Sequence, residues 1–229
     1  MSKNLQKRII TSIILLSLLL FVTFSHQLIF ILTILILCTF IYIETNKIIS
    51  KLLRAKYLKK KIFFKKFSYE FLILNLLTFC YIFLIFGSFS YQIYSLNGAV
   101  FFIYLLSICF FTDIGGYIFG NIIGGKKLSK ISPNKTISGS IGSFIFSFFP
   151  LFFFLIIDNS YLELNFNNIL FCFLISLISQ LGDLFVSFFK RKAKIKDTGK
   201  ILPGHGGILD RVDGIIFAIP FSYFLLGLI

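Results

Sequence analysis

Long apolar runs separated by polar loops dominate the sequence of this chain. Seven runs stand out, at about Ile9–Phe24, Leu28–Ile43, Phe71–Gly87, Ala99–Ile123, Ile137–Ile157, Ile169–Phe189 and Asp210–Ile229. A helix that crosses a bilayer needs ~20 predominantly apolar residues, with a range of ~17–25. The pattern predicts an all-α membrane protein, a polytopic transmembrane helical bundle of about seven spans. Because the first two runs are short, a helical hairpin within the membrane is an alternative for them.

Composition agrees with this class. Hydrophobic residues make up 57% of the chain, above the ~45–50% that is typical of soluble domains. The four cysteines (Cys38, Cys80, Cys109 and Cys172) each lie inside an apolar run, without a CxxC pair or a nearby histidine. We interpret them as buried packing residues, and neither a disulfide framework nor a zinc site is supported. No small-residue cleavage site follows the first run, so we expect a retained span and not a signal peptide.

The basic residues predict how the spans are oriented. All 23 lysines and arginines precede the first run or lie in the loops after the second, fourth and sixth runs. The alternate loops, Ser25–Gln27, Ser88–Asn97 and Asp158–Asn168, contain none. The positive-inside rule therefore places the N-terminus in the cytoplasm and the C-terminus outside.

The net charge of +14 is spread over these membrane loops. It therefore indicates membrane lipids with anionic headgroups as partners, and we expect no nucleic-acid binding. The run from Ile48 to Phe67 mixes lysines with Leu, Ile and Phe. It is interpreted either as an amphipathic helix on the cytoplasmic surface or as a solvated connector.

Two aspartates lie in or beside apolar runs, where charge is expensive. Asp183 lies inside the sixth run and Asp113 follows the sequence AVFFIYLLSICFF in the fourth. Intramembrane carboxylates are functional candidates by default. The alternatives are a pair with a nearby Lys or Arg for Asp183 and a place near the membrane boundary for Asp113.

The last run adds two more carboxylates. Its apolar part, Gly214–Ile229, holds 16 residues, which make ~24 Å of helix against a hydrocarbon core of ~30 Å. A helix that starts near Asp210 is long enough, and it puts Asp210 and Asp213 on one face of its first turn. The positive helix end by itself favours carboxylates there. Together with Asp183 they form a candidate site for Mg²⁺ or Mn²⁺, with substrate phosphates as further ligands.

Between the last two runs lies a basic, glycine-rich loop. Lys190, Arg191, Lys196 and Arg211 are natural phosphate partners. Gly204, Gly206 and Gly207 surround His205 and either let the backbone approach an anion or form a flexible turn. His205 is a candidate phosphate contact or acid. The small-residue patches GGYIFGNIIGG and SGSIGS favour either close helix packing or polar cavity walls.

These motifs together closely resemble the phosphatidate cytidylyltransferases, also called CDP-diglyceride synthases. The matching positions of the family signature are Ser187, Lys190, Arg191, Lys196, Asp197, Gly199, Pro203, His205, Gly206, Gly207, Asp210, Arg211 and Asp213. The segments SQLGDL at Ser179–Leu184, DIGGYIFG at Asp113–Gly120 and SPNKT at Ser132–Thr136 resemble upstream family elements. One departure is Ser138, where members usually carry an acidic or amide residue. The resemblance covers roughly residues 100–229, so we expect N-terminal spans with a basic cytoplasmic loop in residues 1–98 and a catalytic transmembrane region in residues 99–229.

The resemblance implies transfer of the cytidylyl group of CTP to phosphatidic acid, a step in phospholipid biosynthesis, with CDP-diacylglycerol and pyrophosphate as products. It implies that Asp183, Asp210 and Asp213 hold Mg²⁺, with a second cation left open, and that Lys190, Arg191, Lys196, Arg211 and His205 act in catalysis. Ser132, Lys135, Gly206, Gly207, Asp113 and Asp197 are expected to bind substrate. The resemblance also implies a homodimer. We expect the cell inner membrane from the apparent bacterial type of the chain, and an active site that faces the cytoplasm because CTP is soluble and the phosphatidate headgroup lies at the interface. The alternatives are an enzyme that uses another lipid phosphate and a transporter without CTP chemistry.

Overall fold

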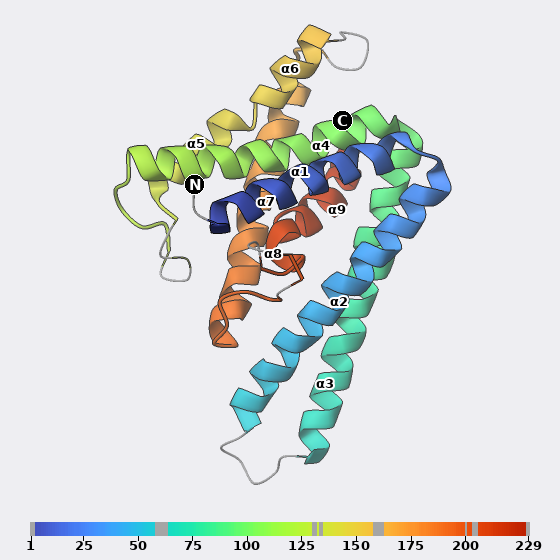
Figure 1. Cartoon of the computed structure of the whole chain (residues 1–229), viewed down its shortest axis with the longest axis vertical. Coiled ribbons are helices and arrows are strands. Elements are labelled where there is room, and N and C mark those ends of the chain that lie inside the picture. Colours follow the sequence, from blue (N-terminus) through green and yellow to red (C-terminus); the bar gives the residue numbers. More distant parts are fainter. Residues whose placement is uncertain are drawn as a thin grey trace. The chain divides into compact units, whose positions relative to one another are not determined.

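The computed structural model describes residues 3–57, 64–129, 132, 135–157, 163–199, 201–202 and 206–227. Within these ranges helices are joined by turns and irregular segments, and two isolated β-bridges are present. The elements are α1 (Lys3–Phe24), α2 (Gln27–Tyr57), α3 (Phe64–Phe79), η1 (Cys80–Gly87), α4 (Ser88–Ile122), α5 (Ile137–Phe146), α6 (Phe149–Ile157), α7 (Phe166–Lys192), α8 (Leu209–Val212) and α9 (Ile215–Leu226) (Figure 1). The η1 segment is a π-helix. The predicted all-α class is confirmed for the described residues.

Within the described residues, four helical stretches are long and apolar enough to cross a membrane. They are Gln27–Tyr57, Tyr69–Ile122, Ile137–Ile157 and Phe166–Lys192, and Ile9–Phe24 is a shorter apolar helix. These helices are compatible with a helical membrane protein. The number of spans and the orientation of the termini stay predictions.

The predicted loop Ser88–Asn97 is wrong, because these residues are helical and belong to α4. The polar side chains fit into the helix since serine hydroxyls can bond back to carbonyls of the preceding turn. Ser90 Oγ donates to Phe86 O at 2.7 Å. The helix is interrupted only at Gly98, whose φ of 84° and ψ of 171° lie outside the helical region.

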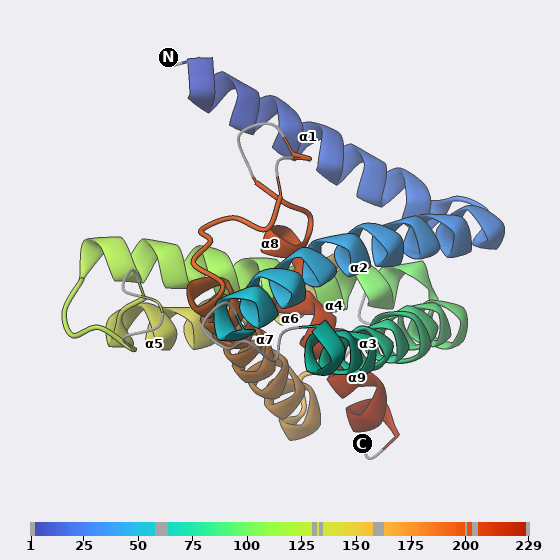
Figure 2. The same ribbon diagram turned by 90° about the horizontal axis from the view of Figure 1, so that it is seen from below.

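The chain folds into two compact units, residues 1–91 with 189–212 and residues 92–188 with 213–229. In the first unit, α2 and α3 pack side by side in opposite directions (Figures 1 and 2). The buried residues Ile49, Leu53 and Tyr57 of α2 pack with Phe71 of α3. Residues 48–57 are therefore the amphipathic end of a packed helix, with Ile49 and Leu53 buried and Lys51 exposed, and they do not form a solvated connector. The place of this helix on the cytoplasmic surface stays a prediction. Residues 58–63 lie outside the described residues.

In the second unit, glycines bring helices into close contact. A Cβ at Gly142 of α5 would lie 2.8 Å from Gly115 O of α4, and a Cβ at Gly182 of α7 would lie 2.6 Å from the ring of Phe217 in α9. Real Cβ atoms do not approach other atoms this closely, so glycine is required at both positions. The small-residue patches of α4 and α5 thus pack against each other, as one of the two predicted alternatives had it.

The last apolar run is not one helix that starts near Asp210. It is divided into α8 and α9, with Asp213 and Gly214 between them. Gly214 lies against α7, where a Cβ would be 2.8 Å from Ser179 O. Asp210 and Asp213 therefore do not share the first turn of a single helix. A residue larger than glycine at position 214 would therefore overlap α7.

Candidate active site

An ion pair joins the two ends of the signature segment, which we define as residues 187–213. Lys190, in the last turn of α7, places its Nζ 2.9 Å from Asp210 Oδ1 of α8, and the two side chains are only 12% and 9% exposed. Charges removed from water at such a place require a partner of opposite sign. The structure thus brings together two of the predicted site residues from the two ends of the loop.

The second carboxylate oxygen of Asp210 fastens the loop itself. Asp210 Oδ2 accepts hydrogen bonds from Thr198 N at 2.8 Å and Gly207 N at 3.0 Å. Burial opposes ionisation of this carboxyl, but the Lys190 ammonium and the two backbone N–H groups outweigh it and hold the pKa of Asp210 below its usual value. Asp210 is therefore an anion that organises the signature segment.

Backbone hydrogen bonds fix Gly206 of the glycine-rich run. Leu202 and Gly206 form an isolated β-bridge, with Leu202 N donating to Gly206 O at 3.0 Å and Gly206 N donating to Leu202 O at 3.2 Å. Gly206 has a φ of 89°, which an L side chain rarely adopts. The backbone conformation at position 206 thus requires glycine. His205 lies outside the described residues, so its predicted role as a phosphate contact or acid stays a prediction.

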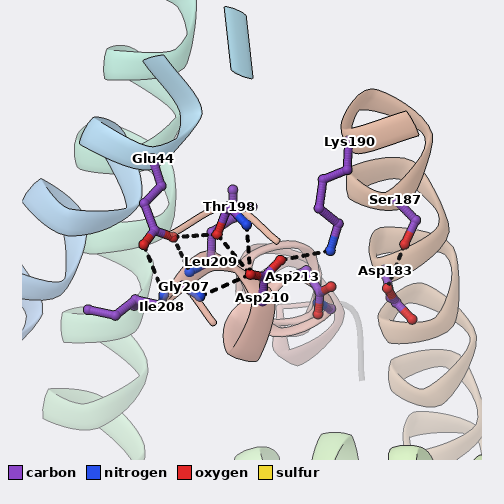
Figure 3. Close-up of polar contacts among 11 residues, drawn as sticks. Glu44, Asp183, Ser187, Lys190, Thr198, Gly207, Ile208, Leu209, Asp210 and Asp213 are labelled. Carbon is purple, nitrogen blue, oxygen red and sulfur yellow. Dashed lines mark hydrogen bonds and ion pairs between the residues drawn. The ribbon is translucent and has the colours of Figure 1, made fainter. Parts of the chain in front are cut away.

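A residue that the sequence reading missed, Glu44 of α2, is fully buried beside this segment (Figure 3). Its carboxylate accepts hydrogen bonds from Thr198 Oγ1 at 2.6 Å, Leu209 N at 2.8 Å and Ile208 N at 3.2 Å. The available signal was an acidic residue at the end of the second apolar run, the same signal that singled out Asp113 and Asp183. No local motif marks it, because its partners lie more than 150 residues further along the chain.

The second unit contains a polar cavity of about 300 Å³. Among its lining residues are Asp113 of α4, Ser132 and Lys135 of the following loop, and Asp183 of α7. Lys135 Nζ forms an ion pair with Asp183 Oδ2, and Ser187 Oγ donates to Asp183 Oδ1 at 3.2 Å. Four of the predicted site residues therefore surround one cavity. Asp183 is paired with Lys135, so the structure contains the ion pair that the sequence analysis named as the alternative for this aspartate.

The small-residue patches also contribute to this cavity. Gly116, Gly139, Ser140 and Ser143 lie in its wall, and Ser140 Oγ donates to Gln180 Oε1 at 2.6 Å. Close helix packing and a polar wall, treated as alternatives in the sequence, thus occur together. Ser138 is not part of the lining and instead bonds to Gly124 O and to Thr136 Oγ1 at the start of α5.

The remaining predicted residues lie at the surface of their units or in turns. Arg191, Lys196, Asp197 and Arg211 are exposed. Asp213 is half-buried in the turn between α8 and α9, where its Oδ1 accepts from Gly214 N at 3.1 Å. Its backbone packs against α7 next to Asp183, since a Cβ at Gly182 would lie 3.0 Å from Asp213 O.

The donor chemistry of the three predicted metal ligands fits Mg²⁺, because carboxylate oxygens are hard ligands. Within the described part of the chain, however, no three His, Cys, Asp or Glu side chains form a group that could hold a metal ion. Asp183 and Asp210 each face a lysine ammonium in this structure. The magnesium assignment stays a prediction.

Comparison with known proteins identifies the family. The sequence model of the Cytidylyltransferase family matches residues 53–229, well over half of the chain. The chain belongs to the cytidylyltransferase family. The resemblance drawn from the signature positions is thereby confirmed.

Several curated members of this family share substantial identity with the chain. A phosphatidate cytidylyltransferase of Rickettsia bellii is 46% identical over 129 residues, which are 51% of this chain and 53% of the relative. Proteins of the same name from Staphylococcus haemolyticus and Staphylococcus aureus are 42% and 44% identical over 134 and 135 residues, in both cases 57% of this chain and 50% of the relative. The chain therefore spans about half the length of the curated relatives it matches.

Proposed function

We propose that this protein is a phosphatidate cytidylyltransferase, which transfers the cytidylyl group of CTP to phosphatidic acid and forms CDP-diacylglycerol and pyrophosphate. The observation that carries this proposal is the match of residues 53–229 to the cytidylyltransferase family. Relatives of the chain bear the name phosphatidate cytidylyltransferase. The activity belongs to phospholipid biosynthesis, and its substrates are one soluble nucleotide and one membrane lipid.

The chemistry of the substrates explains which residues are needed. A phosphate monoester has a second pKa of ~6, so the lipid phosphate is already an anion at neutral pH and needs no general base. The difficulty is to bring this anion to the α-phosphate of a triphosphate. Cationic side chains that neutralise both groups are therefore the main requirement.

The chain supplies these cations from two places. Lys190, Arg191, Lys196 and Arg211 belong to the signature segment, and Lys135 lines the cavity of the second unit. We assign the first four to substrate and pyrophosphate charge, with His205 as a further candidate. Ser132, Lys135, Gly206, Gly207, Asp113 and Asp197 are proposed contacts to nucleotide or lipid phosphate.

The proposed metal ligands are Asp183, Asp210 and Asp213, and a bound Mg²⁺ would supply further neutralisation of phosphate charge. Whether a second cation binds is left open. Asp183 and Asp210 each form an ion pair with a lysine, Lys135 and Lys190 respectively. We further propose seven spans in the cell inner membrane, a cytoplasmic active site and a homodimer.

The test is formation of CDP-diacylglycerol by the purified protein in detergent, from labelled CTP and phosphatidic acid, with and without Mg²⁺. Magnesium-dependent product is expected. No product from a folded preparation would contradict the proposal. Other lipid phosphates offered in competition test the alternative of a different lipid substrate, because the cationic residues contact phosphate and not the acyl chains.

A further inference from the structure

We propose that Glu44 is a positioning residue of the active site, which holds Thr198 and residues 207–210 in the arrangement in which Asp210 meets Lys190. The inference rests on the proposed function for its effect on turnover. Glu44 lies upstream of residues 53–229, the stretch that matches the family. A side chain outside the matched stretch thus completes the signature segment.

The first argument is the cost of burying this carboxylate. Glu44 has no exposed surface, and a carboxylate removed from water needs strong donors to be tolerated. The donors are the Thr198 hydroxyl and the N–H groups of Ile208 and Leu209. All three donors belong to the signature segment (Figure 3). The burial of Glu44 is therefore tolerated only while these residues keep the conformation in which they donate to it.

The second argument is the hydroxyl shared by two carboxylates. Thr198 Oγ1 lies 2.6 Å from Glu44 Oε2 and 3.1 Å from Asp210 Oδ2. A hydroxyl has a single proton, and the shorter contact takes it. Glu44 therefore directs the hydroxyl toward itself and leaves Asp210 Oδ2 to the backbone N–H groups of Thr198 and Gly207.

The third argument is the pair of glycines packed on the carboxylate. A Cβ at Gly207 would lie 2.6 Å from Glu44 Oε1, and one at Gly199 would lie 3.1 Å from Glu44 Cδ. A side chain at Gly207 cannot be accommodated without moving the carboxylate or the loop. Gly207 therefore packs directly on the carboxyl group of Glu44, and its predicted approach to a substrate anion stays a prediction.

The experiment compares Glu44→Gln with Glu70→Gln. Glu70 undergoes the same chemical change in the same unit, but its side chain forms an ion pair with Lys56 and interacts with Tyr57, two residues of α2. In hydrogen–deuterium exchange of the detergent-solubilised protein, Glu44→Gln should speed exchange at the amides of residues 206–212 by roughly 10-fold. Glu70→Gln should leave these amides unchanged.

The activity readout uses the folded fraction of each variant. Glu44→Gln should lower kcat by about 10- to 100-fold, because small displacements of a site have effects of this size. A residue that only stabilises the fold would reduce the amount of folded protein and leave its kcat unchanged. Unchanged kcat of the folded fraction, or unchanged exchange at residues 206–212, would overturn the proposal.

A pair of substitutions at Thr198 decides the matter if Glu44→Gln does not fold. Thr198→Ser keeps the hydroxyl and should retain wild-type kcat and exchange. Thr198→Val has the same shape without the hydroxyl, and it should show the lower kcat and the faster exchange at residues 206–212. Equal behaviour of the two variants would contradict the role of the Glu44–Thr198 contact. If the wild-type protein forms no CDP-diacylglycerol, the proposed function fails, and the exchange measurements still test Glu44 independently.

Discussion

Each of the two units contains an aspartate paired with a lysine, and the two pairs differ in their surroundings. Asp210 and Lys190 are 9% and 12% exposed, and Asp210 also accepts two backbone N–H bonds. Asp183 and Lys135 are 24% and 29% exposed and line a cavity of about 300 Å³. The first pair is built into the backbone of its loop, whereas the second is open to a ligand. Residues that are equivalent as predicted metal ligands thus have different surroundings.

The largest effect is expected from the carboxylate that neither pair contains. Asp213→Asn removes a proposed Mg²⁺ ligand and changes the shape of the side chain very little. We expect turnover to fall by about 10³-fold or more, with expression and membrane insertion intact. Chelation of Mg²⁺ should abolish the activity of the wild-type protein as well. Near-normal turnover by the variant in the labelled-CTP assay would remove the metal assignment of Asp213.

The comparison of the two pairs is tested most directly by removing each lysine. Lys190→Met leaves Asp210 buried without its ammonium partner, so the protein should lose about 3–5 kcal/mol of stability. Lys135→Met should lose only roughly 1 kcal/mol, because its pair is open to the cavity, but turnover should still fall by about 100-fold. Thermal unfolding in detergent and the activity assay measure the two effects. Equal destabilisation by both substitutions would break the comparison.

Acid should weaken the contribution of the Asp210–Lys190 pair to the stability of the fold. Because the pKa of Asp210 is lowered in the folded protein, its stabilising contribution is complete above the ordinary aspartate pKa of ~3.9 and is lost as the pH falls below this value. We therefore expect wild type and Asp210→Asn to differ in thermal midpoint at neutral pH and to converge below about pH 4. A constant difference across that range would show that ionisation of Asp210 does not stabilise the fold.

The smallest effect is expected at Ser138, the position that departs from the family pattern. Its hydroxyl donates to Gly124 O and contacts Thr136, a residue of the cavity lining, but Ser138 itself does not line the cavity. Ser138→Ala should cost about 0.5–1.5 kcal/mol of stability and leave turnover of the folded protein unchanged. A clear loss of turnover in the folded fraction would indicate that Ser138 acts in the site after all.

Local patterns in the sequence determined a large part of this protein. The apolar runs predicted helices, and most described residues of these runs are helical, with turns at Ser147–Phe148 and Asp213–Gly214, because helix formation depends largely on neighbours along the chain. The spacing of Lys190, Asp210 and the other signature positions was enough to identify the family. Where local pattern was the only guide, as at Ser88–Asn97, polar residues were misread as a loop, since their hydroxyls are satisfied by carbonyls of the same helix.

Tertiary structure decided how the signature is held together. Glu44 and Thr198 are 154 residues apart, and no periodicity or motif connects positions at such a separation. The need for glycine at position 214 likewise depends on the close approach to Ser179. Contacts of this kind are selected by packing and by the need to pair buried polar groups, and these conditions exist only after the chain has folded. The sequence alone therefore determined the helices and the family, and the folded chain determined which carboxylate organises the loop and which faces the cavity.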